Sequence, residues 1–539
     1  MRKFAWVLLV FLAACGRETP APPPPAPTTT QATDTGPRAG GRLVRRLESD
    51  VNTLNPLLQS TEDEKQVLQY LFDPLIDVNQ ELEPIPGTIA RWEILDAGKT
   101  YVLHIDPRAK FSDGQPVTAA DVLFTLERIG KGESPQFGSY FDALDLEKTQ
   151  AVDDRTVRVA FREARVPQLL SFNMIAALPK HVYAKGKFDQ VRAVVGNGPY
   201  VLKRRESGKA IYLERNEQYW REKPHIDQVV FRVIEDDTVA WNALRRGDVH
   251  VARINNDAWM RVKDDPEVQQ RIVFHDRYEL MYNCVPWNLN DPLFQDVRVR
   301  RALAMAYDLD TIIQRIYHGN ARPISGPFPA DSWAYNPSIH PIGYNPQGAA
   351  ALLASAGWVD SNKDGVLDRD GKPFTFELLI PAGSNVSSDQ SQVYQDALKR
   401  IGVQMTIRPA EGAAFFERIL ESDYQAAFMA WTVDPDPDPY GLFHSSQLPP
   451  GGLNVVHYKN AEADRLLERG RTEFDRARRT EIYHQFHELI AADQPYLFMM
   501  QVGLKWAVDK RVQNVRSAKG VGLFLWNPGP FGWWMKEPA

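Results

Sequence analysis

Three aspartates in one short segment are the side chains of this sequence that most clearly invite chemistry. Asp434, Asp436 and Asp438 are each followed by proline in the stretch Trp431-Thr432-Val433-Asp434-Pro435-Asp436-Pro437-Asp438-Pro439-Tyr440. Residues two apart in an extended chain share one face, so Asp434 and Asp436 have the minimum arrangement for acid and base catalysis of a hydrolysis. A rigid solvated turn is the alternative, because a residue before proline prefers an extended backbone.

No other segment carries a recognisable catalytic fingerprint. The sequence lacks G-x-S-x-G, a phosphate-binding loop, G-x-G-x-x-G and H-E-x-x-H. His484 and His487 lie one helical turn apart beside Glu488, but their order is wrong for a zinc protease, and we interpret them as packing or surface residues. Cys284 has no histidine at a nucleophile spacing and is predicted to be a small core residue. We predict no cofactor and no metal.

The stretch 360–371 resembles a calcium loop without completing one. Oxygen side chains alternate before a glycine, at Asp360, Asn362, Asp364, Gly365 and Asp368. The glutamate that ends an EF-hand loop is absent, because its position holds Gly371. These residue types also form ordinary tight turns, which we favour, with calcium binding as the alternative.

Length and composition indicate a large globular protein. Of the 539 residues, 43% are hydrophobic and 24% charged, which excludes a disordered chain, collagen and a polytopic membrane protein. Lys and Arg number 63 against 69 Asp and Glu, a net charge of −6, so no basic excess favours nucleic acid as a partner. With Cys15 and Cys284 as the two cysteines, the fold must depend on packing.

The N-terminus has the features of a lipoprotein export signal. Arg2 and Lys3 precede an apolar run over 4–14 that is too short to span a bilayer. Its end, Leu-Ala-Ala-Cys-Gly at 12–16, resembles a bacterial lipobox, so we expect 1–14 to be a signal peptide and Cys15 to carry lipid. An ordinary signal peptide with a chance cysteine is the alternative. Residues 15–39, rich in Pro, Thr and Ala, are predicted to form an extended tether.

Strand-like and helix-like patterns alternate along the rest of the chain. Apolar and polar alternation predicts strands over 43–47, 101–105, 156–161, 229–234 and 374–380. Amphipathic spacing predicts helices over 119–129 after Thr118, over 297–307 and over 476–491. No fixed-period repeat is present, which excludes solenoids and propellers. The pattern is typical of an α/β protein of several lobes.

A series of short motifs extends over nearly the whole mature chain. They are Phe72-Asp73-Pro74-Leu75-Ile76, the stretch 111–118 with Ala120-Asp121-Val122, Gly196-Asn197-Gly198-Pro199-Tyr200, 216–220 with Pro224, the stretch 297–308, and Ala356-Gly357-Trp358. In type and in order these motifs resemble the large extracytoplasmic solute-binding proteins of ABC importers, family 5, which includes oligopeptide- and dipeptide-binding proteins.

The resemblance implies a two-lobed α/β fold of the type II periplasmic-binding-protein kind, which closes on its ligand about a hinge. It also implies an additional subdomain inserted in the N-terminal lobe. The expected boundaries are 40–76 and 195–283 for lobe I, 77–194 for the inserted subdomain, 284–504 for lobe II, and 505–539 for a return to lobe I.

In this family a Trp-x-x-Asp segment lines the cleft, and its aspartate pairs with the α-amino group of a bound peptide. The matching residue is Asp434, so the resemblance implies an ammonium held by a carboxylate away from water. Trp431 would be an apolar wall, with Thr432 and Asp436 beside it. Pro435 removes a backbone N–H next to the aspartate, so ligand geometry can differ from that of typical relatives.

An extended peptide also needs strand-like protein segments at the cleft. The candidates are 48–54 and 279–283. Tyr282, Asn283 and Trp287 add polar and aromatic surface at the crossing between the lobes. Packing is the alternative for these three, because a lobe junction needs buried aromatic residues.

The expected function is that of a monomeric, non-enzymatic receptor of the cell envelope, attached to the membrane by lipid on Cys15. It would capture peptides outside the cytoplasmic membrane and deliver them to the permease of an ABC transporter. Three alternatives stay open: a non-peptide ligand such as an oligosaccharide, an opine or a metal chelate; a hydrolase that uses Asp434 and Asp436; and a receptor that serves a signalling partner.

Overall fold

The computed structural model describes residues 36–79, 81–134, 136–185, 188, 193–516 and 530–536. The predicted signal peptide, Cys15 and most of the predicted tether lie outside these residues. One compact unit covers 38–539. None of the helices in the described ranges is long and apolar enough to cross a membrane.

The largest sheet of the described chain belongs to two lobes at once. Its strands are β1 (Arg42–Leu47), β8 (Tyr200–Glu206), β9 (Ala210–Arg215), β10 (Gln228–Val233), β11 (Val251–Ile254), β12 (Ile272–Tyr278), β13 (Met281–Pro286), β14 (Ala321–Pro323), β20 (Met429–Thr432) and β21 (Tyr496–Asp509). The strand order is β20-β13-β21-β11-β1-β10-β9-β8, with β12 and β14 also paired to β21. The first half of β21 pairs with β13 and β14 in lobe II, and the second half pairs with β11 and β12 in lobe I.

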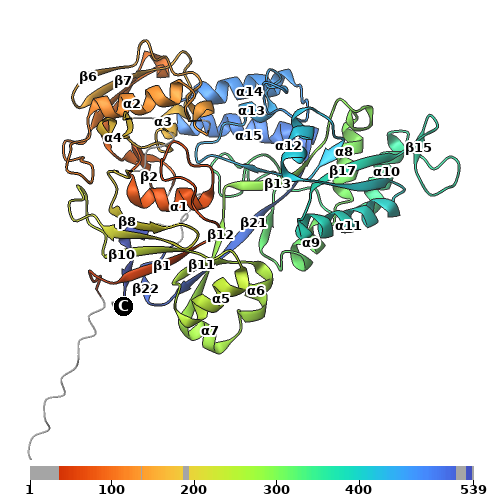
Figure 1. Ribbon diagram of the computed structural model, residues 1–539. Helices are drawn as coiled ribbons and strands as arrows, with labels where there is room; N and C mark the ends of the chain where they lie inside the picture. Colours follow the sequence, from red (N-terminus) through yellow and green to blue (C-terminus); the bar gives the residue numbers. More distant parts are fainter. Residues whose placement is uncertain are drawn as a thin grey trace, which may run out of the picture. The chain divides into compact units, whose positions relative to one another are not determined.

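Lobe I covers both faces of its part of this sheet with helices. These are α1 (Glu62–Leu71) on one face and, near the other, α5 (Asp237–Arg246), α6 (Asn256–Val262) and α7 (Pro266–Arg271). Alternation along β1 explains the two layers: Leu43 packs in the core with Val67 of α1, whereas Val44 packs in a separate core with Leu244 of α5. Both layers are visible around β1 in Figure 1.

The inserted subdomain, expected over 77–194, begins with the pair formed by β2 (Ile76–Val78) and β3 (Pro84–Pro86). Its sheet has the order β4-β5-β7-β6, formed by β4 (Ile89–Leu95), β5 (Thr100–Ile105), β6 (Gln150–Asp153) and β7 (Thr156–Ala160), and its helices are α2 (Ala119–Gly130), α3 (Gln168–Ser171) and α4 (Lys180–Tyr183). A capping box between Thr118 and Asp121 starts α2. Tyr101 and Leu103 of β5 share one hydrophobic core with Leu43, so the subdomain is packed onto lobe I.

Lobe II adds a parallel sheet with the order β18-β17-β19, formed by β17 (Thr375–Pro381), β18 (Gln404–Ala410) and β19 (Ala426–Ala427). Its helices are α8 (Val297–Met305), α9 (Leu309–Arg315), α10 (Pro346–Ser355), α11 (Asn385–Arg400), α12 (Gly412–Leu420), α13 (Tyr440–Phe443), α14 (Ala461–Thr472) and α15 (Arg476–Asp493). Short pairs are formed by β15 (Asp368–Arg369) with β16 (Lys372–Pro373), and by β22 (Val512–Gln513) with β23 (Trp534–Met535). After lobe II the chain returns, and Trp533 lies in the core of lobe I.

The strands and helices predicted from the sequence are confirmed, whereas the lobe boundaries stay predictions. Each predicted strand and helix occurs, with bounds that differ by at most two residues. The helix predicted over 297–307 ends at Met305, because Asp308 caps the next helix, α9, by accepting a hydrogen bond from the N–H of Thr311.

Candidate functional site

The Asp-Pro segment follows directly on β20, an edge strand. Among the described residues β20 pairs only with β13. Its side chains alternate, with Met429 and Trp431 half-buried and Ala430 and Thr432 exposed. Such an edge presents backbone N–H and C=O groups to which an extended chain can add as a further strand.

Asp434 lies two residues beyond β20 and is half-buried. Its Oδ1 accepts a hydrogen bond of 3.2 Å from the hydroxyl of Tyr140. Tyr140 belongs to the 3-10 turn Gly138–Phe141 of the inserted subdomain, so this bond joins the subdomain to lobe II. No cationic side chain in the described chain forms an ion pair with Asp434.

Burial raises the pKa of Asp434 to about 6. The neighbouring Asp438 and Asp436 raise this pKa further, whereas the hydrogen bond from Tyr140 and the charge of Lys65 lower it. A carboxylate in these surroundings is costly to ionise, and an ammonium group placed against it would offset that cost.

Asp436 does not face a ligand, contrary to the sequence-based prediction. It is buried, and its Oδ1 lies 2.5 Å from Nη1 of Arg479 on α15, which is also buried. Neutralising the buried guanidinium requires a carboxylate at this point. Asp434 and Asp436 therefore have different partners, and the paired acid and base of the hydrolase alternative is not formed in this structure.

Asp438 is also held by an arginine. Arg471 Nε lies 2.9 Å from Asp438 Oδ2, and the guanidinium sits 4.0 Å above the ring of Tyr440. The indole N–H of Trp333 donates to the carbonyl of Pro435 at 3.2 Å. These contacts fix the segment, so that Asp434 is the carboxylate of the three left without a cation.

Two predicted aromatic contacts are core residues in this structure. Tyr282 and Trp287 are fully buried; Tyr282 packs 6.0 Å from Phe498, and Trp287 stacks on Phe294 at 5.1 Å between ring centroids. Tyr282 is enclosed because β13 runs between β20 and β21 with packing on both faces. Asn283, between them, is half-buried and lines a cavity.

Four backbone N–H groups of the segment 48–54 are already hydrogen-bonded to side chains of α1. Asp63 Oδ2 accepts from the N–H groups of Glu48 and Ser49 at 3.1 and 2.7 Å. Glu64 Oε1 accepts from those of Asn52 and Thr53 at 3.0 and 3.2 Å. Because the first turn of α1 already uses these four donors, the segment is a poor template for an added strand.

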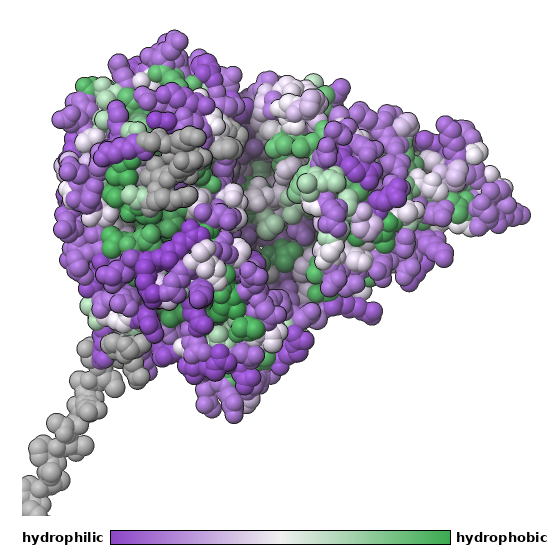
Figure 2. Space-filling model, viewed as in Figure 1, coloured by the Kyte–Doolittle hydropathy of each residue, from purple (hydrophilic) through white to green (hydrophobic). Residues whose placement is uncertain are grey.

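Two neighbouring cavities extend from β20 toward lobe I. The first, the apolar cavity, has a volume of about 340 Å³ and is lined by Asn283, Cys284, Tyr317, Pro381, Ser384, Val386, Ser387, Gln390, Phe415, Phe416, Phe428, Met429, Ala430 and Met499. The second, the charged cavity, has about 300 Å³ and includes Glu48, Asp237, Arg253, Asp257 and Lys505. Both include Tyr317 and Val386. Figure 2 shows the molecular surface hollowed between the lobes, with hydrophobic residues inside the hollow.

The cations of the charged cavity are already paired. Arg253 forms an ion pair with Glu48, and Lys505 Nζ lies 2.5 Å from Asp276 Oδ1. Lys505 also lies 4.0 Å from the centroid of the Trp259 ring. Neither cation is therefore left for a ligand carboxylate.

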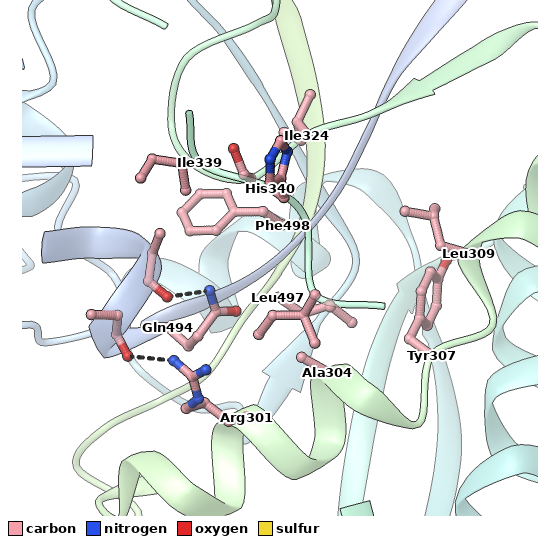
Figure 3. Close-up of a pocket in the computed structure, with 14 residues that line it drawn as sticks. Arg301, Ala304, Tyr307, Leu309, Ile324, Ile339, His340, Gln494, Leu497 and Phe498 are labelled. Carbon is pink, nitrogen blue, oxygen red and sulfur yellow. Dashed lines mark hydrogen bonds between the residues drawn. The ribbon is translucent and has the colours of Figure 1, made fainter. Parts of the chain in front are cut away.

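A further cavity, of about 210 Å³, lies beside α8 and the end of α15 (Figure 3). Arg301 donates to the carbonyl of Ala492 at 3.5 Å, and Gln494 donates to that of Ala491 at 2.8 Å. This cavity shares no lining residue with the other two, and we assign no ligand to it.

The remaining sequence candidates have local structural partners. His487 is buried, which lowers its pKa to about 4; its Nδ1 accepts from the N–H of Asn336 at 3.1 Å, and Nε2 lies 3.1 Å from Ser325 Oγ. Asp360 accepts from the N–H groups of Asp364 and Gly365, as in an ordinary turn. Within the described ranges no group of three or more His, Cys, Asp or Glu residues is placed to hold a metal ion.

Sequence reasoning missed Tyr140, Val386 and Phe416. Tyr140 lies 294 residues from Asp434, and no local pattern around it indicates a role. The pair Phe415-Phe416 did carry a signal, because adjacent residues on a helix cannot both face the same core. Phe415 is buried and Phe416 is 57% exposed.

Comparison with known proteins gives the class of this protein. The model of the family described as bacterial extracellular solute-binding proteins, family 5 Middle, matches residues 83–452. The chain therefore belongs to family 5 of the bacterial extracellular solute-binding proteins. Its fold is that of the type II periplasmic binding proteins, with an additional subdomain inserted in the N-terminal lobe.

Similar proteins have different ligands in their names. The chain is 30% identical over 526 residues to the oligopeptide-binding protein AppA of Bacillus subtilis (strain 168), covering 95% of this chain and 94% of that protein. The structure of Bacillus subtilis AppA in complex with a nonapeptide matches with a TM-score of 0.74 and 28% identity, covering 93% of this chain and 100% of that one. Heme-binding protein A of Haemophilus influenzae is 26% identical over 457 residues, covering 80% of this chain and 81% of that protein.

Proposed function

We propose that this protein binds peptides between its lobes and delivers them to the permease of an ABC transporter. The observation that carries the proposal is the state of Asp434. Its carboxylate lies two residues beyond the edge strand β20 and has no cationic partner in the described chain. A peptide α-ammonium group at this carboxylate would leave its main chain free to run along β20.

The neighbouring residues have roles that fit an extended ligand. Thr432 and Ala430 are exposed on β20, and the half-buried Trp431 lies between them. The amide of Asn283 lies on the adjacent strand, at the wall of the apolar cavity. These groups serve the peptide main chain, so their contacts do not themselves distinguish ligand side chains.

The charged cavity, at the end of the cleft away from Asp434, favours ligands of variable length. Because Arg253 and Lys505 are already paired with acidic residues, the charged cavity offers no cation to fix a C-terminal carboxylate. An amine-anchored peptide can therefore extend past it. The peptide relatives in the comparisons support this class of ligand.

The attachment to the membrane is part of the proposal. Lipid on Cys15 and the tether 15–39 would hold the monomeric binding unit at the cell envelope, outside the cytoplasmic membrane. We also propose lobe boundaries near 283 and 504. They lie close to the passage from β12 to β13 and to the middle of β21, where the partners of that strand change.

Native mass spectrometry of the chain from Arg38 onward, before and after denaturing release of bound material, tests the ligand class. We expect short peptides at one per protein. Calorimetry with penta-alanine then tests the anchor: N-acetylation should abolish binding, whereas C-terminal amidation should change the dissociation constant less than about threefold. A single non-peptide mass, or binding that ignores acetylation, would overturn the proposal.

A further inference from the structure

The apolar cavity lies where a parallel sheet ends. The strands β17, β18 and β19 are parallel and finish at Pro381, Ala410 and Ala427. The chain then turns into α11, α12 and β20; the first turn of α11 contributes Val386 to the cavity wall, and the second turn of α12 contributes Phe416. The crevice beyond the carboxyl ends of parallel strands is the usual ligand position in α/β sheets.

The chemistry of its walls is that of an apolar side-chain pocket. Phe415, Phe428 and Met499 are buried around it, and the flexible thioether of Met499 can adapt to different apolar shapes. At the mouth, Val386 is 42% and Phe416 is 57% exposed. Large apolar side chains that gather beside a cavity mark a surface that a ligand covers.

Most polar side chains of the wall already have hydrogen-bond partners. Gln390 accepts from the hydroxyl of Tyr307 at 3.1 Å and donates to that of Tyr317 at 3.0 Å. Ser384 and Ser387 are joined at 2.9 Å. A charged ligand side chain would thus lose its water without gaining a partner of opposite charge.

Strand β20 sets the distance between the cavity and Asp434, the proposed amine anchor. Met429 and Ala430 belong both to the cavity wall and to β20. Asp434 follows Ala430 by four residues, roughly 13 Å at the rise of an extended strand. A peptide with its amine at Asp434 and its main chain along β20 would bring its third, fourth or fifth residue to the cavity.

We propose that the apolar cavity holds the side chain of one internal ligand residue, the third to fifth, and selects a large aliphatic or aromatic side chain there. This inference rests on the proposed peptide-binding function and narrows its ligands. The volume of about 340 Å³ falls within the size range of small-ligand pockets.

A position-scanning series of hexa-alanine peptides with free amines tests the selectivity. Leu, Phe or Glu replaces one alanine at a time, and calorimetry gives each dissociation constant. We expect Leu or Phe to be favoured over Glu by about tenfold or more at one position from three to five, with little preference at the others.

Two variants connect this preference to the cavity. In the double variant Val386→Ala/Phe416→Ala, the affinity for the Leu peptide should exceed that for the Glu peptide by less than about threefold at that position. In Phe416→Lys, the Glu peptide should bind more tightly than the Leu peptide. Because neither native side chain is buried in the core, these changes should leave the fold intact. Leu420→Ala is the matched control, since Leu420 lies on the same helix, is 42% exposed and does not line the cavity.

The outcomes separate this inference from the function on which it rests. Peptides that need both a free amine and Asp434, but show no preference at any of positions three to five, would overturn the inference alone. A preference that persists in the double variant would also overturn it. If no peptide binds, the proposed function fails and the inference fails with it.

Discussion

The hydroxyl of Tyr140 donates a hydrogen bond of 3.2 Å to Asp434 Oδ1, which joins the inserted subdomain to lobe II. A second bond joins the same two parts nearby, from the N–H of Val166 to the carbonyl of Arg471 at 2.8 Å. The proposed amine anchor therefore lies at a contact between the subdomain and lobe II. A ligand held by Asp434 meets both sides of this contact.

Replacing Asp434 by Asn should weaken the binding of free-amine peptides by at least about 2 kcal/mol, roughly thirtyfold, because the ammonium loses its opposite charge. Calorimetry with penta-alanine measures the change. Asp438→Asn is the matched control in the same segment: its partner is Arg471, so affinity should change little. Equal, small effects at both positions would contradict the anchor.

Peptide affinity should fall as the pH drops below about 6. Burial raises the pKa of Asp434 from its ordinary 3.8 to about 6, whereas the ligand ammonium stays charged throughout this range. Protonation then removes the charge that the amine needs, with a limiting slope of about tenfold per pH unit. Titration calorimetry from pH 5 to 8 measures this slope, and Asp434→Asn should flatten it.

Asp434 affects folding stability in the direction opposite to its effect on peptide affinity: lower pH should weaken binding but stabilise the fold. Because the folded pKa lies above the unfolded value, the native state holds a proton between about pH 4 and 6 that the unfolded chain has released. The contribution of Asp434 to the free energy of unfolding should rise as pH falls through 6. Denaturant unfolding of wild type and Asp434→Asn at pH 5 and 7 measures this difference.

Removing the hydroxyl in Tyr140→Phe should move the pH midpoint of binding upward. The hydrogen bond favours the charged form of Asp434 and lowers its pKa, so its loss makes protonation easier. Affinity should decrease by up to about fivefold below pH 6, the value of one hydrogen bond, and change little at pH 7.5, where Asp434 stays ionised in both proteins. Tyr212→Phe is a control tyrosine in lobe I, and a midpoint that stays in place for Tyr140→Phe would contradict the contact.

Arg479→Met should lower stability strongly, by about 3 kcal/mol or more, because it leaves Asp436 buried without its charge partner. Thermal unfolding measures the loss. The double variant Asp436→Asn/Arg479→Met should recover much of it, since neither charge is then buried alone. An unchanged melting temperature in the single variant would show that the ion pair does not support the fold.

Local sequence patterns were sufficient to predict several strands and helices, but not the long central strand β21. The alternation over 229–234 and the capping residue Thr118 each depend on neighbours in the chain, and the elements occur at those positions. The lobes and the inserted subdomain came from the family resemblance, because the pairing of β1 with β10 and β11 joins residues about 200 positions apart.

The site was harder to predict than the fold. Residue type and spacing alone did not distinguish the three aspartates, and only the family resemblance singled out Asp434. In the structure, Arg479 and Arg471 pair with the other two. Tyr282 and Trp287 are of residue types common in binding clefts, yet both are buried in the core, where they serve packing. Such outcomes depend on tertiary packing, which spacing along the chain does not contain.

Strand β21 has a consequence for how the molecule matures. It provides the partners of β11, β12, β13 and β14, and all four strands precede it in the chain. A ribosome or a secretion channel that releases the polypeptide from its N-terminus delivers these strands before their common partner. Until β21 follows, neither half can complete its sheet, so both halves gain their final order with the same strand.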